Sequence, residues 1–369
     1  MVKAFDYLRS YEQIEPEIRA AIDRVLRSGQ LILGPEVAAF EREFAATVGA
    51  VEAVGVASGT DALELALLAV GVGRDDEVIT VANTAVPTAA AIRAVGAVPR
   101  FVDVDPDTLL MSPSLVAAAI TPRTRCLLPV HLHGLSAEMP ALLDIARRHD
   151  LRVIEDCAHA HGASHKGRHV GTFGDVGCFS FYPTKNLGAY GDGGMCVTNN
   201  VRLAERLRSL RMYGFDANRI AQTDGRNSRL DEVQAAILRV KLTHLPAALA
   251  ARQDIAGAYR RGLSGLPCRL PAAHDDAVHA CHQFVIRCPN RGGVMAACDA
   301  RGVGYGIHYE TPLHHMPAYR GAHEGRPPLP VTDAAATEIL SLPIYPELRA
   351  DEIEQVIAAV RAGLSGEGR

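Results

Sequence analysis

The sequence predicts an α/β protein in which a mostly parallel sheet is covered by helices on both faces and is followed by a smaller α+β domain. From Val51 to about Thr198, short apolar runs typical of strands alternate with segments of helical spacing, and this alternation is typical of parallel sheets. Beyond about Arg252 the pattern changes. We therefore predict a large domain over residues 1–251, which includes an N-terminal arm, and a small domain over residues 252–369.

Each element follows from local spacing and turn residues. Apolar residues from Ile14 to Leu26 predict a helix that Gly29 ends, and Gly34-Pro35 opens a second helix. The sheet region predicts strands at 53–57, 77–81, 99–102, 126–130, 152–155, 177–180 and 194–198, and helices at 61–70, 88–95, 114–120, 141–149 and 202–212. A polar loop to Ser228 and a long helix from Asp231 follow. The last part predicts a strand at 283–288, a helix at 294–301, an extended segment at 303–309, a loop at 311–330, and helices at 334–340 and 351–362.

Composition excludes several classes of protein. The net charge of −4 and the absence of a basic run mixed with aromatics argue against a nucleic-acid partner. Eight cysteines without a Cys-x-x-Cys pair indicate a reducing, cytoplasmic compartment. No uncharged stretch of 18 residues is present, so we expect no membrane association.

Polar residues follow several predicted strands, and the carboxyl ends of parallel strands form the ligand-binding edge of such sheets. Ser58-Gly59-Thr60 opens a helix, where backbone N–H groups could bind a phosphate or where a side chain could simply cap the helix. Asp156 ends another strand and could bind a ligand or pair locally, and Ser180 could bind a phosphate. We expect these residues, with His131 and His133, to converge on one edge.

Lys185 lies 29 positions after Asp156, among apolar, aromatic and turn residues. A lysine amine reacts well with carbonyl groups only where burial or a neighbouring cation lowers its pKa. Lys185 could be a solvated loop residue or a nucleophile whose neighbouring acid holds a cofactor. The glycines at 188, 191, 193 and 194 lack the order of a nucleotide-binding loop and favour a tight turn that seats Lys185.

Five separated motifs, in order, resemble the DegT/DnrJ/EryC1/StrS family, and the resemblance extends from about Tyr7 to Pro346. The motifs are Ser58-Gly59-Thr60, the segment from Glu155 to His159, the segment from Phe179 to Gly188, Gly191-Asp192-Gly193-Gly194, and the segment from Asn227 to Glu232. The family consists of sugar aminotransferases that depend on pyridoxal 5′-phosphate (PLP). The resemblance implies fold type I of the PLP-dependent transferases, the aspartate aminotransferase-like fold.

The resemblance also implies site roles. Lys185 would hold PLP covalently and then move a proton, and Asp156 would pair with the protonated pyridine nitrogen. His159, where many members have glutamine, would lie against the ring. Gly59, Thr60 and Ser180 would bind the phosphate, joined by Asn227 from the second subunit of a homodimer, and Ser58 would be a further cofactor-binding residue. Many relatives place a stacking aromatic where this chain has Ala85, so the stacking role stays unassigned.

The implied activity moves the amino group of L-glutamate, or of glutamine, through pyridoxamine 5′-phosphate to the ketone of a nucleotide-linked sugar, as in antibiotic biosynthesis. Residues 6–41 look most like enzymes that act on dTDP-linked 3-keto-6-deoxyhexoses. A 4-keto sugar or a cyclitol ketone remains an alternative. A regulatory relative that binds without turnover is another alternative, and so is a dehydratase or epimerase, although related dehydratases have histidine in place of the lysine.

Further residues could contact the substrate. Arg229 could meet a diphosphate or only a neighbouring carboxylate, and His308, Tyr309 and His314 could contact the sugar or nucleotide or serve in packing. The pairs His131-x-His133 and His159-x-His161 could suggest a metal site, but no acid- or cysteine-rich set completes a ligand shell. We therefore expect no metal.

Overall fold

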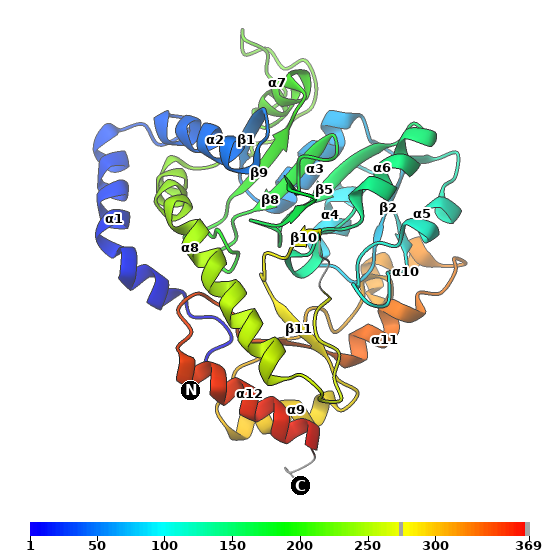
Figure 1. The fold of residues 1–369 in the computed structure, drawn as a ribbon. Helices are drawn as coiled ribbons and strands as arrows, with labels where there is room; N and C mark the ends of the chain where they lie inside the picture. Colours follow the sequence, from blue (N-terminus) through cyan, green and yellow to red (C-terminus); the bar gives the residue numbers. More distant parts are fainter. Residues whose placement is uncertain (273–275, 366–369) are drawn as a thin grey trace.

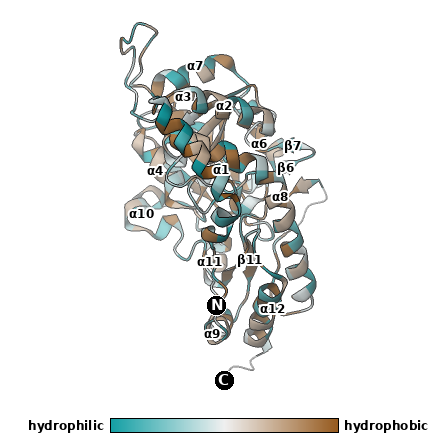
Figure 2. Cartoon of the chain, turned by 90° about the vertical axis from the view of Figure 1, so that its left-hand side faces the viewer, coloured by the Kyte–Doolittle hydropathy of each residue, from teal (hydrophilic) through white to brown (hydrophobic). Residues whose placement is uncertain are grey.

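The computed structural model describes residues 1–272 and 276–365. Two helices precede the sheet, α1 (Tyr7–Ser28) and α2 (Pro35–Val48). As predicted, α1 ends at Gly29, whose φ of 69° is a left-handed conformation that glycine adopts without strain. Apolar residues of α1 are buried against the long helix α8 (Glu232–Gly262), and Figure 2 shows apolar and polar residues alternating along α1.

The central sheet has seven strands in the order β1-β9-β8-β5-β4-β2-β3. The strands are β1 (Glu52–Val56), β2 (Glu77–Val81), β3 (Val98–Val102), β4 (Thr124–Leu127), β5 (Arg152–Asp156), β8 (Val176–Ser180) and β9 (Gly194–Thr198). Strand β9 is antiparallel to both of its neighbours, and the other neighbouring pairs are parallel. The prediction of a mostly parallel sheet is therefore confirmed.

Helices cover both faces of this sheet, as predicted (Figure 1). The connecting helices are α3 (Gly59–Val70), α4 (Val86–Ala94), α5 (Pro113–Ala119), α6 (Met139–Arg148) and α7 (Val201–Leu210), with a short 3-10 turn, η1 (Leu132–Gly134). Alternate residues of β8 face opposite ways. Cys178 packs in the core formed with α3, and Phe179 packs in the core formed with α2 and α8.

The C-terminal part has its own hydrophobic core. Tyr259 of α8, Phe284 and Tyr345 are fully buried there, together with the N-terminal residue Val2. Its elements are β11 (Phe284–Arg287), α9 (Arg291–Ala300), β12 (Ile339–Leu342) and α12 (Ala350–Ser365). A separate small sheet joins β6 (Ser164–His165), β7 (Arg168–His169) and β10 (Ala277–Val278). Helix α8 runs through the proposed boundary at 251/252 and connects the sheet to α12 (Figure 1).

Two predictions about residues 311–340 were wrong. The expected loop contains η2 (Leu313–His315) and α10 (Pro317–His323), and the expected helix at 334–340 is α11 (Pro330–Glu338) followed by a strand. Prolines 317 and 330 stand at the first helical position, where a missing N–H costs nothing, so they begin helices rather than exclude them. Residues 339–342 pair with β11, and this pairing overrides the helix predicted to extend to residue 340.

Within the described ranges, no helix combines the length and the apolar character that a membrane crossing requires.

Candidate active site

A cavity of about 240 Å³ lies at the carboxyl ends of β5 and β8 and at the beginning of α3. Seven of the eight predicted cofactor residues line this cavity, namely Ser58, Gly59, Thr60, Asp156, His159, Ser180 and Lys185. The eighth, Asn227, does not line it and is exposed. Residues from three segments far apart in sequence thus meet at one place, because the strand ends share one edge of the sheet.

The first turn of α3 and the end of β8 form one wall of the cavity. The Ser58 hydroxyl accepts a hydrogen bond from the Asp61 N–H at 3.1 Å, so Ser58 caps the helix as well as lining the cavity. A Cβ atom on Gly59 would lie 2.5 Å from the Cβ of Ser180, so only glycine permits this close approach. The wall therefore offers backbone N–H groups at a helix N-terminus and a serine hydroxyl, which are suitable donors for a phosphate.

Asp156 is held by hydrogen bonds to both of its carboxylate oxygens. Oδ1 accepts from the Ala158 N–H at 3.1 Å, and Oδ2 accepts from the Thr88 hydroxyl at 2.9 Å. Thr88 uses its hydrogen on Asp156, so Thr84, whose hydroxyl oxygen is 3.0 Å away, donates to Thr88. Burial raises the pKa of Asp156, while these donors and the Lys185 ammonium favour the ionised form. Thr84 and Thr88 were not predicted from the sequence, since a threonine near the start of a helix carries no distinctive pattern.

Lys185 lies in a loop that is fixed at several points. Its N–H donates to the Tyr182 carbonyl at 2.8 Å, and the Ala189 N–H donates to the Phe181 carbonyl at 2.8 Å. The neighbouring Asn186 amide donates to the Ala280 carbonyl at 2.8 Å. Burial lowers the pKa of Lys185 to about 8, against the opposing effect of Asp156. The amine is therefore poised to react near neutral pH.

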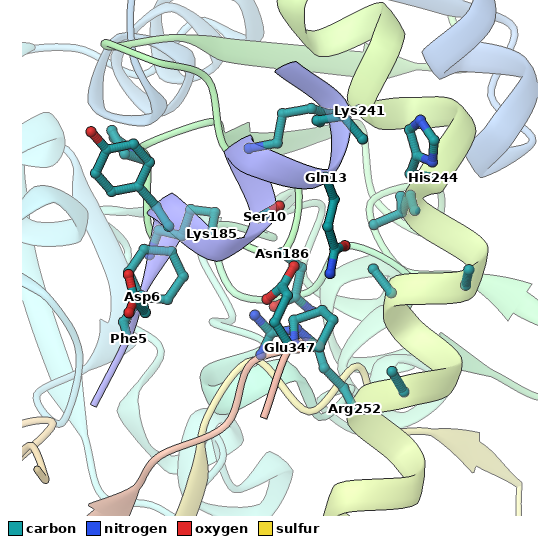
Figure 3. A pocket seen from close by; sticks show the side chains of 18 residues that line it. Phe5, Asp6, Ser10, Gln13, Lys185, Asn186, Lys241, His244, Arg252 and Glu347 are labelled. Carbon is teal, nitrogen blue, oxygen red and sulfur yellow. The ribbon is translucent and has the colours of Figure 1, made fainter. Parts of the chain in front are cut away.

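A second cavity, of about 300 Å³, lies beside Lys185 between α1, α8 and residues 346–347 (Figure 3). Its walls include Lys241, which burial also gives a pKa of about 8. The Lys241 amine donates to the Gly188 carbonyl and lies 4.9 Å from the ring centre of Tyr190. Although this cavity is the larger, we assign cofactor binding to the smaller one, because that one combines the α3 N-terminus, Ser180 and Asp156 with Lys185.

His159 belongs to a group of buried rings beside the cofactor cavity. Its Nδ1 accepts from the His133 N–H at 3.3 Å, its Nε2 lies 3.5 Å from the Tyr309 hydroxyl, and its ring centre is 4.5 Å from that of His282. Burial and the nearby Lys185 hold the pKa of His159 well below its usual value, so the ring is neutral at pH 7. Ala85 also lines the cavity, so a methyl group lies at the position where the resemblance places an aromatic in many relatives.

The other candidate substrate residues do not line the cofactor cavity. His308 Nδ1 lies 2.8 Å from the Ser341 hydroxyl, and His314 Nε2 lies 3.0 Å from Asp333. An Arg229 N–H points at the sulfur of Met212 at 3.7 Å. Of these candidates, Tyr309 alone reaches the cavity wall, through its contact with His159.

His131 was expected near this edge but has a structural role. The Ala137 N–H donates to its Nδ1 at 3.0 Å, so its Nε2 carries the hydrogen and donates to Glu155 at 2.9 Å. Glu155 also accepts from the N–H groups of Gly171, Phe173 and Gly174. Both oxygens of this buried carboxylate therefore accept two hydrogen bonds each, and these bonds hold residues 171–174 against the sheet.

The cavity residues fit PLP. The Gly59–Ser180 approach leaves space and donors for a phosphate, a buried carboxylate suits a ring nitrogen, and a lysine with a lowered pKa suits an aldehyde. These are the features by which proteins bind this cofactor and adjust its electronic properties.

Comparison with known proteins found one family model, described as the DegT/DnrJ/EryC1/StrS aminotransferase family, that matches residues 12–361. The chain is 47% identical over 368 residues to a dTDP-3-amino-3,4,6-trideoxy-alpha-D-glucose transaminase from Micromonospora megalomicea subsp. nigra, covering 98% of each chain. It is 44% identical to a UDP-N-acetyl-3-dehydro-alpha-D-glucosamine 3-aminotransferase from Acidithiobacillus ferrooxidans, covering 98% of this chain and 97% of the relative. Among solved structures, DesV of S. venezuelae matches with a TM-score of 0.94 and 47% identity, covering 98% of this chain and 97% of DesV.

Proposed function

The chain belongs to the DegT/DnrJ/EryC1/StrS aminotransferase family, and from this premise we propose that it transfers the amino group of L-glutamate to the ketone of a dTDP-linked 3-keto-6-deoxyhexose. It is a PLP-dependent aminotransferase that acts on nucleotide-linked keto sugars. The observation that carries the proposal is a single cavity that combines the Lys185 amine, the buried Asp156 carboxylate and the α3 N-terminus.

PLP supplies an aldehyde that carries the amino group and a conjugated ring that accepts the electron pair left by proton removal. Gly59, Thr60 and Ser180 would bind its phosphate, and His159 would lie beside its ring. Asp156 would be ionised and would pair with the ring nitrogen, since Thr88 and Ala158 direct hydrogen bonds at its carboxylate.

Lys185 performs the proton transfers. With a pKa of about 8, about a tenth of its amines are neutral at pH 7 and can act as a base. In the first half-reaction the neutral Lys185 amine would remove the proton from Cα of the amino donor, and the resulting ammonium would deliver it to the cofactor carbon that takes up the amino group. In the second half-reaction the amine would take a proton back from that carbon, and the ammonium would deliver it to the sugar carbon that receives the amino group. One side chain thus serves as base and then as acid, which requires a pKa near the working pH.

The names of two relatives support position 3 of the sugar. One relative is named for a dTDP-3-amino sugar and the other for a UDP-linked 3-dehydro sugar. The position is the same in both names whereas the nucleotide differs, so the support is stronger for the ring carbon than for dTDP. A 4-keto sugar and a cyclitol ketone remain the alternatives.

Isotope transfer tests this proposal. The enzyme would be incubated with glutamate labelled with nitrogen-15 and with dTDP- and UDP-linked 3-keto and 4-keto deoxysugars, and the product would be examined by NMR. We expect the label on C3 of the dTDP sugar. Label on C4, or transfer only to the UDP sugars, would contradict the assigned substrate but not the aminotransferase reaction.

Thr88→Val is expected to move the acid side of the pH–activity profile upward by about one unit. Loss of a hydrogen bond to a charged group removes roughly 1.5 kcal/mol, which corresponds to about one pKa unit. The Asp156 carboxylate would thus need a higher pH to ionise and pair with the ring nitrogen. Thr88→Ser keeps the hydroxyl and serves as the control. An unchanged profile in Thr88→Val would exclude the positioning role of Thr88.

We further propose that the active enzyme is a homodimer in which Asn227 completes the site of the partner. Asn227 lies near the end of the loop between α7 and α8, where its backbone is bridged to Met212, and its exposed side chain lies outside the cofactor cavity of its own chain. Part of this loop projects from the top of the molecule in Figure 1. An exposed residue that does not reach its own cavity is available to a second subunit.

Mixed dimers test the shared site. Lys185→Ala and Asn227→Ala are each expected to be weakly active, but random exchange of subunits should restore up to about a quarter of the sites. Mixing Lys185→Ala with Asp156→Ala is the control, because those two residues lie in the same subunit and no intact site can form. Equal activity of both mixtures, after demonstrated exchange, would contradict the proposal.

A further inference from the structure

Three side chains outside the active site converge at the junction between η2 and α11. The Nε2 atoms of His314 and His315 lie 3.0 Å and 2.8 Å from the same oxygen, Oδ1 of Asp333. Their three potential ligand atoms all lie within 4.8 Å of one another. Both imidazoles therefore direct a nitrogen toward one carboxylate, and two imidazole nitrogens with a carboxylate oxygen are a donor set that also binds metal ions.

We propose that His314, His315 and Asp333 bind a divalent transition-metal ion of the zinc type. Imidazole nitrogen and carboxylate oxygen bind zinc at about 2.0–2.1 Å, and two such ligands at a tetrahedral angle are about 3.3 Å apart. The present N···O distances are shorter by only a few tenths of an ångström. Small side-chain rotations would therefore suffice to admit the ion, and imidazole with carboxylate favours zinc over magnesium.

The surroundings allow an ion to enter the cluster. The side chains of His315 and Asp333 are 55% and 42% exposed, so solvent can deliver the ion and supply a water as the fourth ligand. The side chain of His314 is only 6% exposed, so the cluster joins one buried ligand to two that solvent reaches.

A second group of potential ligands comprises His131, Glu155 and Cys157. Its members are less available to an ion. Both ring nitrogens of His131 are engaged, and Glu155 accepts from three backbone N–H groups. That group is also completely buried. The cluster of His314, His315 and Asp333, which is partly exposed, is therefore the better candidate.

The ion would fasten η2 to α11. The Leu313 N–H donates to the Ala82 carbonyl at 2.9 Å, which joins η2 to the end of β2, and Thr332 of α11 bonds Asp103 beyond β3. A metal ion would replace the direct contacts of His314 and His315 with Asp333 by coordinate bonds, and would so strengthen the existing link between η2 and α11. We therefore expect metal binding to raise the melting temperature, independently of the aminotransferase reaction.

Zinc titration of the tag-free holoenzyme tests the site, with calorimetry for affinity and stoichiometry and thermal melts for stability. His315→Gln and Asp333→Asn remove ligands that are partly exposed, and His149→Gln removes an exposed histidine elsewhere. We expect one Zn²⁺ per wild-type chain, binding weakened at least about 10-fold in the two cluster variants, unchanged binding in His149→Gln, and a Zn²⁺-dependent rise in melting temperature that only the cluster variants lose. Absence of binding by the wild type, or wild-type affinity in either cluster variant, would overturn the proposal.

Discussion

Lys185→Ala is expected to lower turnover at least roughly 1,000-fold, because in the proposed mechanism this one residue holds the cofactor and also moves the proton. Alanine can do neither. The purified variant should also lack the absorbance change that borohydride causes when it reduces a covalent link between lysine and PLP. Steady-state kinetics and absorbance spectra would measure both effects.

Lys166→Ala provides the control for this experiment. Lys166 is 63% exposed, and its amine lies 3.8 Å from Asp276 at the surface, so its loss should leave turnover and the spectrum unchanged. A Lys185→Ala enzyme with normal turnover would end the proposed mechanism.

Asp156→Ala is expected to lower turnover roughly 100- to 10,000-fold while the protein still binds some PLP. In the proposed site, the ring nitrogen would lose the partner that keeps it protonated, and the ring would become a weaker acceptor of electrons. The phosphate contacts proposed for Gly59, Thr60 and Ser180 would remain, so cofactor affinity should fall less than turnover does. Titration with PLP and single-turnover kinetics would separate the two quantities.

Asp192→Asn is the matched control, because Asp192 also lines the cofactor cavity but is exposed. It removes one negative charge from the same cavity without touching the ring-nitrogen position. If Asp156→Ala retained normal turnover, or if both variants lost activity equally, the assigned role of Asp156 would be wrong.

The alternating sheet and most of the cofactor cavity could be predicted from the sequence alone. The end of each strand can be recognised from its own residues, because an apolar run is followed by a polar residue. The carboxyl ends of neighbouring parallel strands meet at one edge of the sheet, so Ser58, Asp156 and Ser180 could be placed together there. Lys185 could be recognised because it is a lysine that closely follows the strand at 177–180 and lies among apolar and turn residues. The resemblance to a family of known chemistry then supplied the roles.

What could not be predicted from the sequence depends on contacts between distant segments. Residues 339–342 form a strand because β11 lies beside them, although the local pattern predicts a helix up to residue 340. The Thr84–Thr88–Asp156 chain joins residues about 70 positions apart, and nothing local distinguishes these threonines from others. The positions of His308 and His314, bonded to Ser341 and Asp333, likewise depend on tertiary packing.

The most direct test of the central claim asks which lysine carries the cofactor. The chain has only four lysines, and Lys241 shares with Lys185 a burial-lowered pKa of about 8. The holoenzyme would be reduced with borohydride and digested, and the lysine that carries the pyridoxyl mass would be identified by mass spectrometry. We predict the added mass on Lys185 alone, because only Lys185 lines the cavity that contains Asp156 and Ser180. Added mass on Lys241, or on no lysine, would contradict the assignment of Lys185.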